Sequence, residues 1–244
     1  MDYKKPDNKN DFLEFKKGVL SSLKNLIDTL CGSDDSKSYK KGVLLVYWLR
    51  DYMGYIKQER TFKPKFLPKY PQGSIIDVNF GFRVGSELGG RHYAIVLDRN
   101  NSKESQTITV VPLSSLKNER QKKLKYNVLL GESLYNLMVA KIKMQKYENS
   151  KEFLNLIRVD ANLSKEEAAT SIKKVQELTL AQDKALKRLH KLKKGSFASL
   201  GQITTISKMR IMDPLHPTDS LYNIKLPKEE LDKISARIKS LYLT

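Results

Sequence analysis

The feature that most constrains the fold is a change of hydrophobic pattern at Gly73. From there, short β-branched runs bounded by glycine, asparagine and serine follow one another closely, which is typical of strands. The runs are Ser74–Phe80, Tyr93–Asp98, Thr107–Pro112, Lys125–Leu130 and Phe197–Ile206. Short strands at close intervals predict a small barrel or a strongly bent sheet.

Helical patterns surround these strands, so we expect an α+β fold. Asp11–Cys31 and Tyr39–Glu59 carry apolar residues at helical spacing and predict an N-terminal helical hairpin. Glu132–Lys194 predicts a long helical insertion that contains a capping box beginning at Ser164. Lys228–Leu243 predicts a C-terminal amphipathic helix.

The predicted domain boundary follows from the prolines. Phe62–Gln72 contains three of them, which exclude a helix and indicate an extended linker. We expect an N-terminal helical extension over residues 1–68 and a barrel domain over residues 69–244, interrupted by the helical insertion over 131–194. The insertion should form an antiparallel arm that carries partner contacts more than catalysis.

Composition narrows the class of protein. The chain has 45 Lys+Arg against 27 Asp+Glu, a formal charge of +18, which favours a polyanionic partner such as nucleic acid. One cysteine makes no internal disulfide, and with three histidines it leaves no Cys/His cluster for zinc, so we expect no metal or cofactor. No apolar run approaches the roughly 20 residues of a membrane span, and the N-terminus does not resemble a signal peptide. We therefore expect a cytoplasmic protein without membrane association.

A glycine-rich loop between two predicted strands carries the candidate chemistry. Its glycines, which permit a tight turn, are Gly85, Gly89 and Gly90. Its carboxylate, guanidinium and imidazole come from Glu87, Arg91 and His92. Acid–base chemistry on a phosphodiester needs this mixture of groups. On its own the pattern also fits a solvated turn, and it is not a P-loop because no Gly-Lys-Ser/Thr ends it.

Three segments in order resemble the MazF/PemK family of toxin endoribonucleases. They are the Gly85-Ser86-Glu87 loop, the turn Pro112-Leu113-Ser114-Ser115, and the run Gln202–Ile211. They are similar to the family's Gly-Ser-Glu-x-Gly-Gly loop, its Pro-Leu-Thr-Ser-like turn and its Gln-Ile-Arg-Thr-Ile-Asp-Lys-x-Arg-Leu segment. The resemblance covers residues 71–126 and 195–211.

The resemblance implies both a fold and an activity. It implies an SH3-like barrel that acts as the toxin of a toxin–antitoxin system, restrained by a small antitoxin protein and dimeric through its barrel. It further implies metal-independent cleavage of single-stranded RNA, in which the ribose 2′-OH attacks the adjacent phosphate. The products would be a 2′,3′-cyclic phosphate and a 5′-hydroxyl.

The resemblance also assigns the site residues. The family's catalytic arginine aligns with His92, the position before it with Arg91, and its assisting threonine with Ser114. Neighbours on a strand point to opposite faces, so either His92 or Arg91 reaches the phosphate. Glu87 either orients one of them or stabilises the loop. The implied RNA-binding residues are Gly85, Ser86, Ser115, Gln202, Thr205, Lys208 and Arg210.

Two alternatives remain from the sequence. The first is a non-catalytic module on the same barrel that binds nucleic acid or protein, which the replacement of arginine by His92 favours. The second is a toxin that poisons gyrase, as a related toxin on this fold does. Retention of Glu87, Arg91, His92 and Ser114 together favours cleavage, because a pure binder needs no such cluster.

Overall fold

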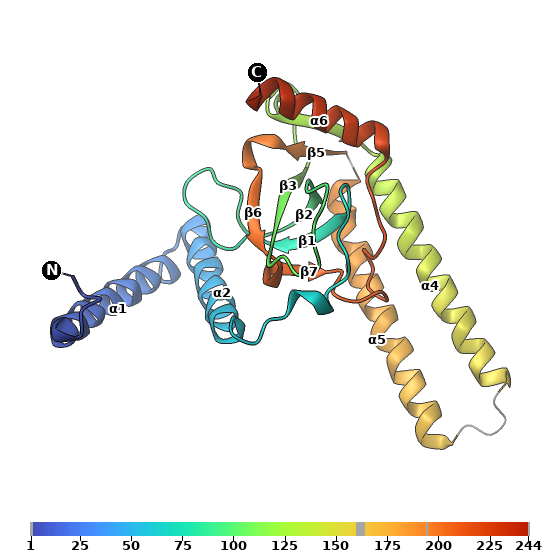
Figure 1. Cartoon of the computed structure of the whole chain (residues 1–244), viewed down its shortest axis with the longest axis horizontal. Helices are drawn as coiled ribbons and strands as arrows, with labels where there is room; N and C mark the ends of the chain where they lie inside the picture. The colour runs from blue at the N-terminus through green and yellow to red at the C-terminus, as the bar shows by residue number, and fades with distance from the viewer. Residues whose placement is uncertain (1, 160–163, 194, 244) are drawn as a thin grey trace. The chain divides into compact units, whose positions relative to one another are not determined.

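The structure is a computed structural model that describes residues 2–159, 164–193 and 195–243 (Figure 1). The chain forms two compact units, Met1–Thr61 and Phe62–Thr244. Within the described residues, no helix combines the length and the apolar character needed to cross a membrane.

The first unit consists of the two predicted helices. They are α1 (Lys9–Cys31) and α2 (Ser36–Gln58), and both are confirmed. The side chain of Asp35 caps α2 by accepting hydrogen bonds from two backbone amides of the first turn. Gly42 lets the helices approach closely, because a Cβ at that position would lie 2.7 Å from the Cys31 sulfur.

The second unit is built on an antiparallel sheet of seven strands. The strands are β1 (Ile75–Asn79), β2 (Arg91–Val96), β3 (Thr107–Ser115), β4 (Asn127–Gly131), β5 (Ser196–Ser199), β6 (Thr204–Ser207) and β7 (Ile211–Asp213). Their order is β4-β5-β3-β2-β1-β7, and β6 also pairs with β3. A short helix, α3 (Glu119–Lys122), precedes β4.

The sheet corrects the expectation of a barrel in one respect: it is not closed. Within the described residues the strand order runs from β4 to β7 without pairing those two strands. The predicted single strand Phe197–Ile206 is in fact β5 and β6, separated by a 3₁₀ turn at Leu200–Gln202. That turn lets β3 pair with β5 at one end and with β6 at the other. The predicted α+β class is confirmed.

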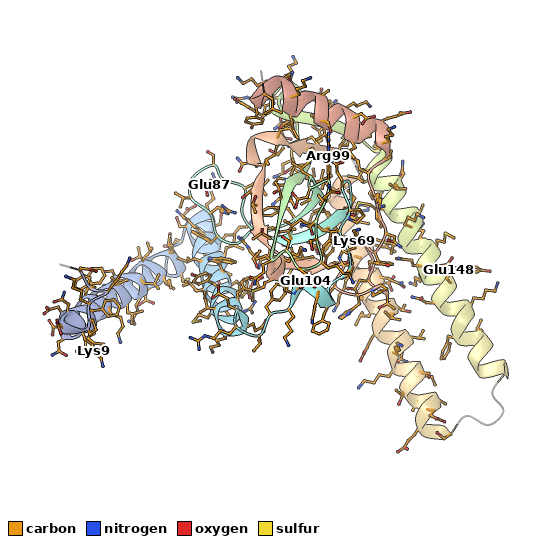
Figure 2. The ribbon with its side chains drawn as sticks, viewed as in Figure 1. Lys9, Lys69, Glu87, Arg99, Glu104 and Glu148 are labelled. Atoms are coloured by element: carbon orange, nitrogen blue, oxygen red, sulfur yellow. The ribbon has the colours of Figure 1, made fainter. Side chains whose placement is uncertain are left out.

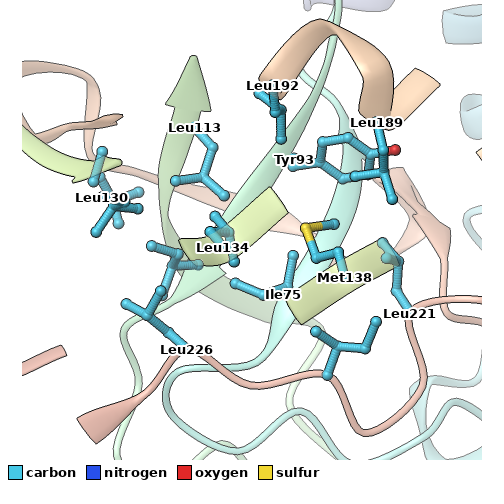
Figure 3. Packing of buried hydrophobic residues seen from close by; sticks show 14 of the residues in the cluster. Ile75, Tyr93, Leu113, Leu130, Leu134, Met138, Leu189, Leu192, Leu221 and Leu226 are labelled. Atoms are coloured by element: carbon cyan, nitrogen blue, oxygen red, sulfur yellow. The ribbon is translucent and has the colours of Figure 1, made fainter. Parts of the chain in front are cut away.

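Alternate residues of the strands pack into two different cores. One face buries a cluster supplied mainly by the strands: Tyr70, Ile76, Val78, Phe80, Ala94, Val96, Ile108, Val110, Ile206 and Ile211. The opposite face, which begins with Ile75, packs against helices (Figure 3). The helices on that face are α4 (Ser133–Val159), α5 (Lys165–Leu189) and α6 (Lys228–Tyr242).

The helical arm is confirmed, and its base belongs to the core. α4 and α5 run antiparallel (Figure 1), and Lys146 of α4 pairs with Asp183 of α5 at 2.8 Å. The predicted capping box at Ser164 is present. Buried side chains from the base of the arm are Leu134, Met138, Ile142 and Leu189 (Figure 3). Deleting the arm would therefore open one of the two cores.

Candidate functional site

The glycine-rich loop is closed at its neck by two glycines. The backbone N–H of Gly90 donates to the Gly81 carbonyl at 2.7 Å, and that of Phe80 donates to the Gly90 carbonyl at 2.8 Å. A Cβ on Gly89 would lie 2.8 Å from the Gly81 oxygen, so only glycine fits there. Gly90 has a φ of +82°, which glycine adopts without strain. The tight loop expected from the sequence is confirmed.

Gln202 holds this loop against the end of β5. Its side-chain oxygen accepts from the Leu88 backbone N–H at 3.0 Å, and its side-chain nitrogen donates to the Ser86 carbonyl at 3.4 Å. The structure thus gives this predicted RNA-binding residue a positioning role. Glu87 is exposed near the tip of the loop (Figure 2), and its carboxylate lies 3.9 Å from the Arg83 guanidinium.

Arg91 and His92 lie on opposite faces of β2. In the pairing with β1, Arg91 is opposite Asn79 and His92 is opposite Val78. The His92 ring lies 6.4 Å from the ring of Phe80, on the face packed by strand residues. Arg91 is on the face covered by the helices, so the two side chains do not share one site.

His92 and Ser114 come from adjacent strands. β2 and β3 pair as far as Ala94 opposite Pro112, and the same register continued by two residues would place Ser114 across from His92. The imidazole Nδ1 lies 3.3 Å from the Leu113 carbonyl oxygen, which confirms that the ring reaches β3. A carbonyl only accepts, so Nδ1–H donates and Nε2 of the neutral ring keeps its lone pair.

The surroundings of His92 favour the neutral imidazole. Burial lowers the pKa of His92 below its usual 6.5, and the positive charge of Lys117 lowers this pKa further. The carbonyls of Leu113 and Gly89 oppose that shift because they favour the protonated ring. Lys117 is a neighbour that sequence reasoning missed, although it lies only three residues after Ser114 in the chain.

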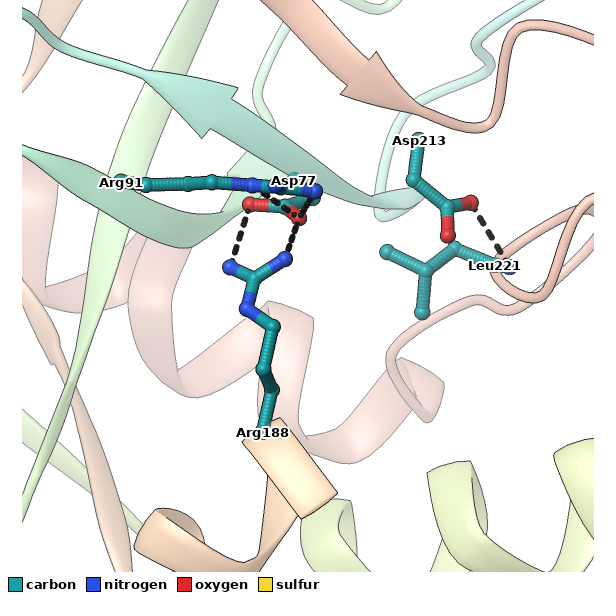
Figure 4. Close-up of polar contacts among 5 residues, drawn as sticks. All are labelled: Asp77, Arg91, Arg188, Asp213 and Leu221. Carbon is teal, nitrogen blue, oxygen red and sulfur yellow. Dashed lines mark hydrogen bonds and ion pairs between the residues drawn. The ribbon is translucent and has the colours of Figure 1, made fainter. Parts of the chain in front are cut away.

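On the helix-covered face, two arginines converge on Asp77 (Figure 4). The Asp77 side chain is 1% exposed and accepts from Arg91 Nε at 2.8 Å. It also accepts from both terminal nitrogens of Arg188, one of them at 2.9 Å. Arg188 comes from α5, so the arm contributes to this cluster. The arm therefore also has a structural role, which the sequence analysis did not predict.

Tyr93 and Asp213 complete the Asp77 cluster. The Arg188 guanidinium lies 5.2 Å from the centre of the Tyr93 ring, and burial raises the pKa of Tyr93 to about 12. Asp213 pairs with Asp77 across β1 and β7, and it accepts from the Leu221 backbone N–H at 3.0 Å. Burial raises the pKa of Asp213 to about 7. Sequence reasoning missed this cluster, since its members come from four distant segments.

The remaining predicted RNA-binding residues lie in different surroundings. Gly85, Ser86 and Thr205 are exposed, and Ser115 is half-buried opposite Ser196 of β5. Arg210 donates from Nε to the Asn79 carbonyl at 2.8 Å. Lys208 is 2% exposed. Its ammonium donates to the Ser102 carbonyl at 2.7 Å, so the structure disfavours the expected RNA contact for this residue.

Over the described ranges, no group of three or more His, Cys, Asp or Glu side chains is placed to hold a metal ion. Residues 71–149 match the model of a family described as PemK-like, MazF-like toxin of type II toxin–antitoxin system. The predicted family resemblance is confirmed. The MazF/PemK-like segment includes β1 to β4, the glycine-rich loop, His92 and Ser114. No curated protein matches the chain.

Proposed function

We propose that this protein is a toxin-type endoribonuclease that cleaves single-stranded RNA at a site formed by His92 and Ser114. The observation that carries the proposal is the reach of the His92 ring to β3, where its Nδ1 lies 3.3 Å from the carbonyl oxygen of Leu113, the residue before Ser114, within the MazF/PemK-like segment. The glycine-rich loop directly precedes His92 in the chain, and its neck is held by hydrogen bonds beside β2.

The proposed reaction is a transesterification. The lone pair of His92 Nε2 takes the proton of a ribose 2′-OH, and the 2′-oxygen bonds to the adjacent phosphorus. The bond from phosphorus to the 5′-oxygen breaks, and that oxygen leaves with a proton from water. The Ser114 hydroxyl donates to a phosphate oxygen, and the nearby Lys117 ammonium stabilises the developing negative charge. DNA lacks the attacking hydroxyl and should resist.

This assignment gives Arg91 a structural role rather than a catalytic one. Its guanidinium is held by Asp77 on the face opposite to His92. Like the family it resembles, the protein would be cytoplasmic, homodimeric and restrained by an antitoxin protein.

The test is cleavage of a long RNA in EDTA, followed by mapping of the new ends. We expect 2′,3′-cyclic phosphate and 5′-hydroxyl ends. His92→Gln should lower the rate by roughly 10²- to 10⁴-fold, as loss of general acid–base catalysis typically does, and Ser114→Ala by more than about tenfold. His190→Gln is the matched control, because His190 is exposed on a 3₁₀ turn after α5.

Three outcomes would contradict the proposal. They are cleavage that requires a divalent ion, products with 5′-phosphate ends, and full activity in His92→Gln. RNA binding without cleavage by the wild-type protein would favour the non-catalytic module instead. The observation in favour of that alternative is that His92 stands where the family has arginine, while the adjacent Arg91 is engaged by Asp77.

A further inference from the structure

A cavity of about 580 Å³ lies between α5 and the segment that connects β7 to α6. Its size is within the range of small-molecule sites. Apolar walls are supplied by Leu178, Ala181, Ala185, Met212 and Leu215. Arg91 and Arg188 line the same cavity, so it adjoins the Asp77 cluster on the helix-covered face of the sheet (Figure 4). It is therefore on the face of β2 opposite to His92.

The cavity has an excess of positive charge. Arg91 and Arg188 share the single carboxylate of Asp77, which leaves one charge uncompensated. A guanidinium has five N–H donors, and in each arginine only some of them are hydrogen-bonded to Asp77. Lys184 and Lys187 of α5 add two further cations to the lining.

Two acidic residues, Asp213 and Asp219, line the cavity against the four cationic residues Arg91, Arg188, Lys184 and Lys187. One carboxylate oxygen of Asp219 accepts from the backbone N–H groups of Leu215 and His216. Asp213 is partly protonated near neutral pH, because burial raises its pKa to about 7. The lining therefore suits an anionic group beside Arg91 and Arg188.

Gln182 supplies the second recognition element. This residue of α5 is among those that line the cavity and is 2% exposed, and neither its buried amide oxygen nor its buried amide nitrogen has a hydrogen-bond partner within the described structure. Buried polar groups normally have partners. An amide offers a donor and an acceptor side by side, which matches the edge of a nucleobase, as in glutamine pairing with N6 and N7 of adenine.

We propose that this cavity binds one nucleotide, with its phosphate on Arg91 and Arg188 and its base on Gln182. Gln182 and Arg188 are six residues apart on α5, a rise of about 9 Å, so the two contacts fall on separate groups of the ligand. The apolar walls pack against the flat faces of the base. The nucleotide is either free or part of an RNA chain, and the experiment separates these sources.

The test is calorimetric titration of the full-length His92→Gln protein with adenosine 5′-monophosphate. Adenosine 5′-monophosphate has no phosphodiester bond to cleave, and this background slows any cleavage of an RNA probe, so the result does not depend on the proposed ribonuclease activity. We expect adenosine 5′-monophosphate to bind at least tenfold more tightly than adenosine or ribose 5-phosphate, each of which offers only one of the two contacts. A hexa-adenylate RNA that binds more tightly still would assign the site to an RNA chain, and one that binds more weakly would assign it to a free nucleotide.

Variants separate the two contacts. Gln182→Leu should weaken adenosine 5′-monophosphate at least tenfold and leave ribose 5-phosphate unchanged. Gln145→Leu is the matched control, because Gln145 also has a buried, unpartnered amide oxygen but does not line this cavity. Lys184→Gln with Lys187→Gln changes exposed positions on α5 and should weaken both ligands without unfolding the protein.

Two results would overturn the proposal. The first is binding of adenosine 5′-monophosphate that is absent or no tighter than that of ribose 5-phosphate. The second is binding by a folded Gln182→Leu protein that equals binding by the Gln145→Leu control.

Discussion

Replacing Asp77 with asparagine tests the link between the sheet and the arm. Asp77 is 1% exposed and holds Arg91 and Arg188 by ion pairs, so Asp77→Asn leaves two guanidinium groups without their counter-charge. Breaking a buried ion pair typically costs about 3–5 kcal/mol. The two arginine side chains are 45% and 32% exposed and regain some hydration, so we expect the lower end, about 3 kcal/mol.

Urea unfolding followed by far-ultraviolet circular dichroism measures this cost. With a slope of about 2 kcal/mol per molar urea, a loss of about 3 kcal/mol lowers the midpoint by about 1.5 M. The matched control is Asp183→Asn, which removes the more exposed pair with Lys146 and should cost less than about 1 kcal/mol. Equal midpoints for the two variants would refute the claim that Asp77 joins the arm to the sheet.

Four further predictions concern single side chains. Asp213 binds its proton more tightly in the folded state than in the unfolded state, so the free energy of unfolding falls as pH rises from about 4 to about 7. Asp213→Asn should remove this loss. Its unfolding midpoint should be higher than that of the wild type at pH 8 and equal to it at pH 4. Burial lowers the pKa of His92, so kcat/KM should rise with pH, with its half-maximal point below pH 6.5, and then level off. A half-maximal point above pH 6.5 would contradict this. Gln202→Ala should speed amide hydrogen exchange at Leu88 about five- to tenfold, since a hydrogen bond contributes about 1 kcal/mol; unchanged exchange would contradict the clamp. Lys208→Met should change the unfolding midpoint and leave RNA affinity unchanged. Weaker RNA binding with an unchanged midpoint would instead support a direct contact between Lys208 and RNA.

Secondary structure could be predicted from the sequence wherever a long pattern repeated. Helical spacing placed α1, α2 and α6 within a few residues of their ends, and β-branched runs located β1 to β4. The break between β5 and β6 was missed, although its 3₁₀ turn contains Gly201, and a glycine within a strand pattern often marks a bend. β7 is three residues long and carries no readable period.

The site was predictable only in its local parts. His92 and Ser114 could be proposed from the sequence because both lie in short motifs, and strand alternation correctly indicated that Arg91 and His92 differ in direction. The pairing of Asp77 with Arg188 spans 111 residues, and no local pattern encodes such a contact. Lys208 was placed in an RNA groove because it aligns with a residue of the family's Gln-Ile-Arg-Thr-Ile-Asp-Lys-x-Arg-Leu segment, whereas here its buried ammonium donates to a backbone carbonyl.

The neck of the glycine-rich loop leaves residues 82–85 open to exchange. The two hydrogen bonds among Phe80, Gly81 and Gly90 involve only the backbone. Segments of other sequence can therefore be grafted over residues 82–85 while β1 and β2 keep their register and Gln202 keeps its hydrogen bonds with Ser86 and Leu88. A library of such grafts would vary the surface next to His92 without altering the strands that carry it, which makes this loop the natural place to engineer a new RNA preference.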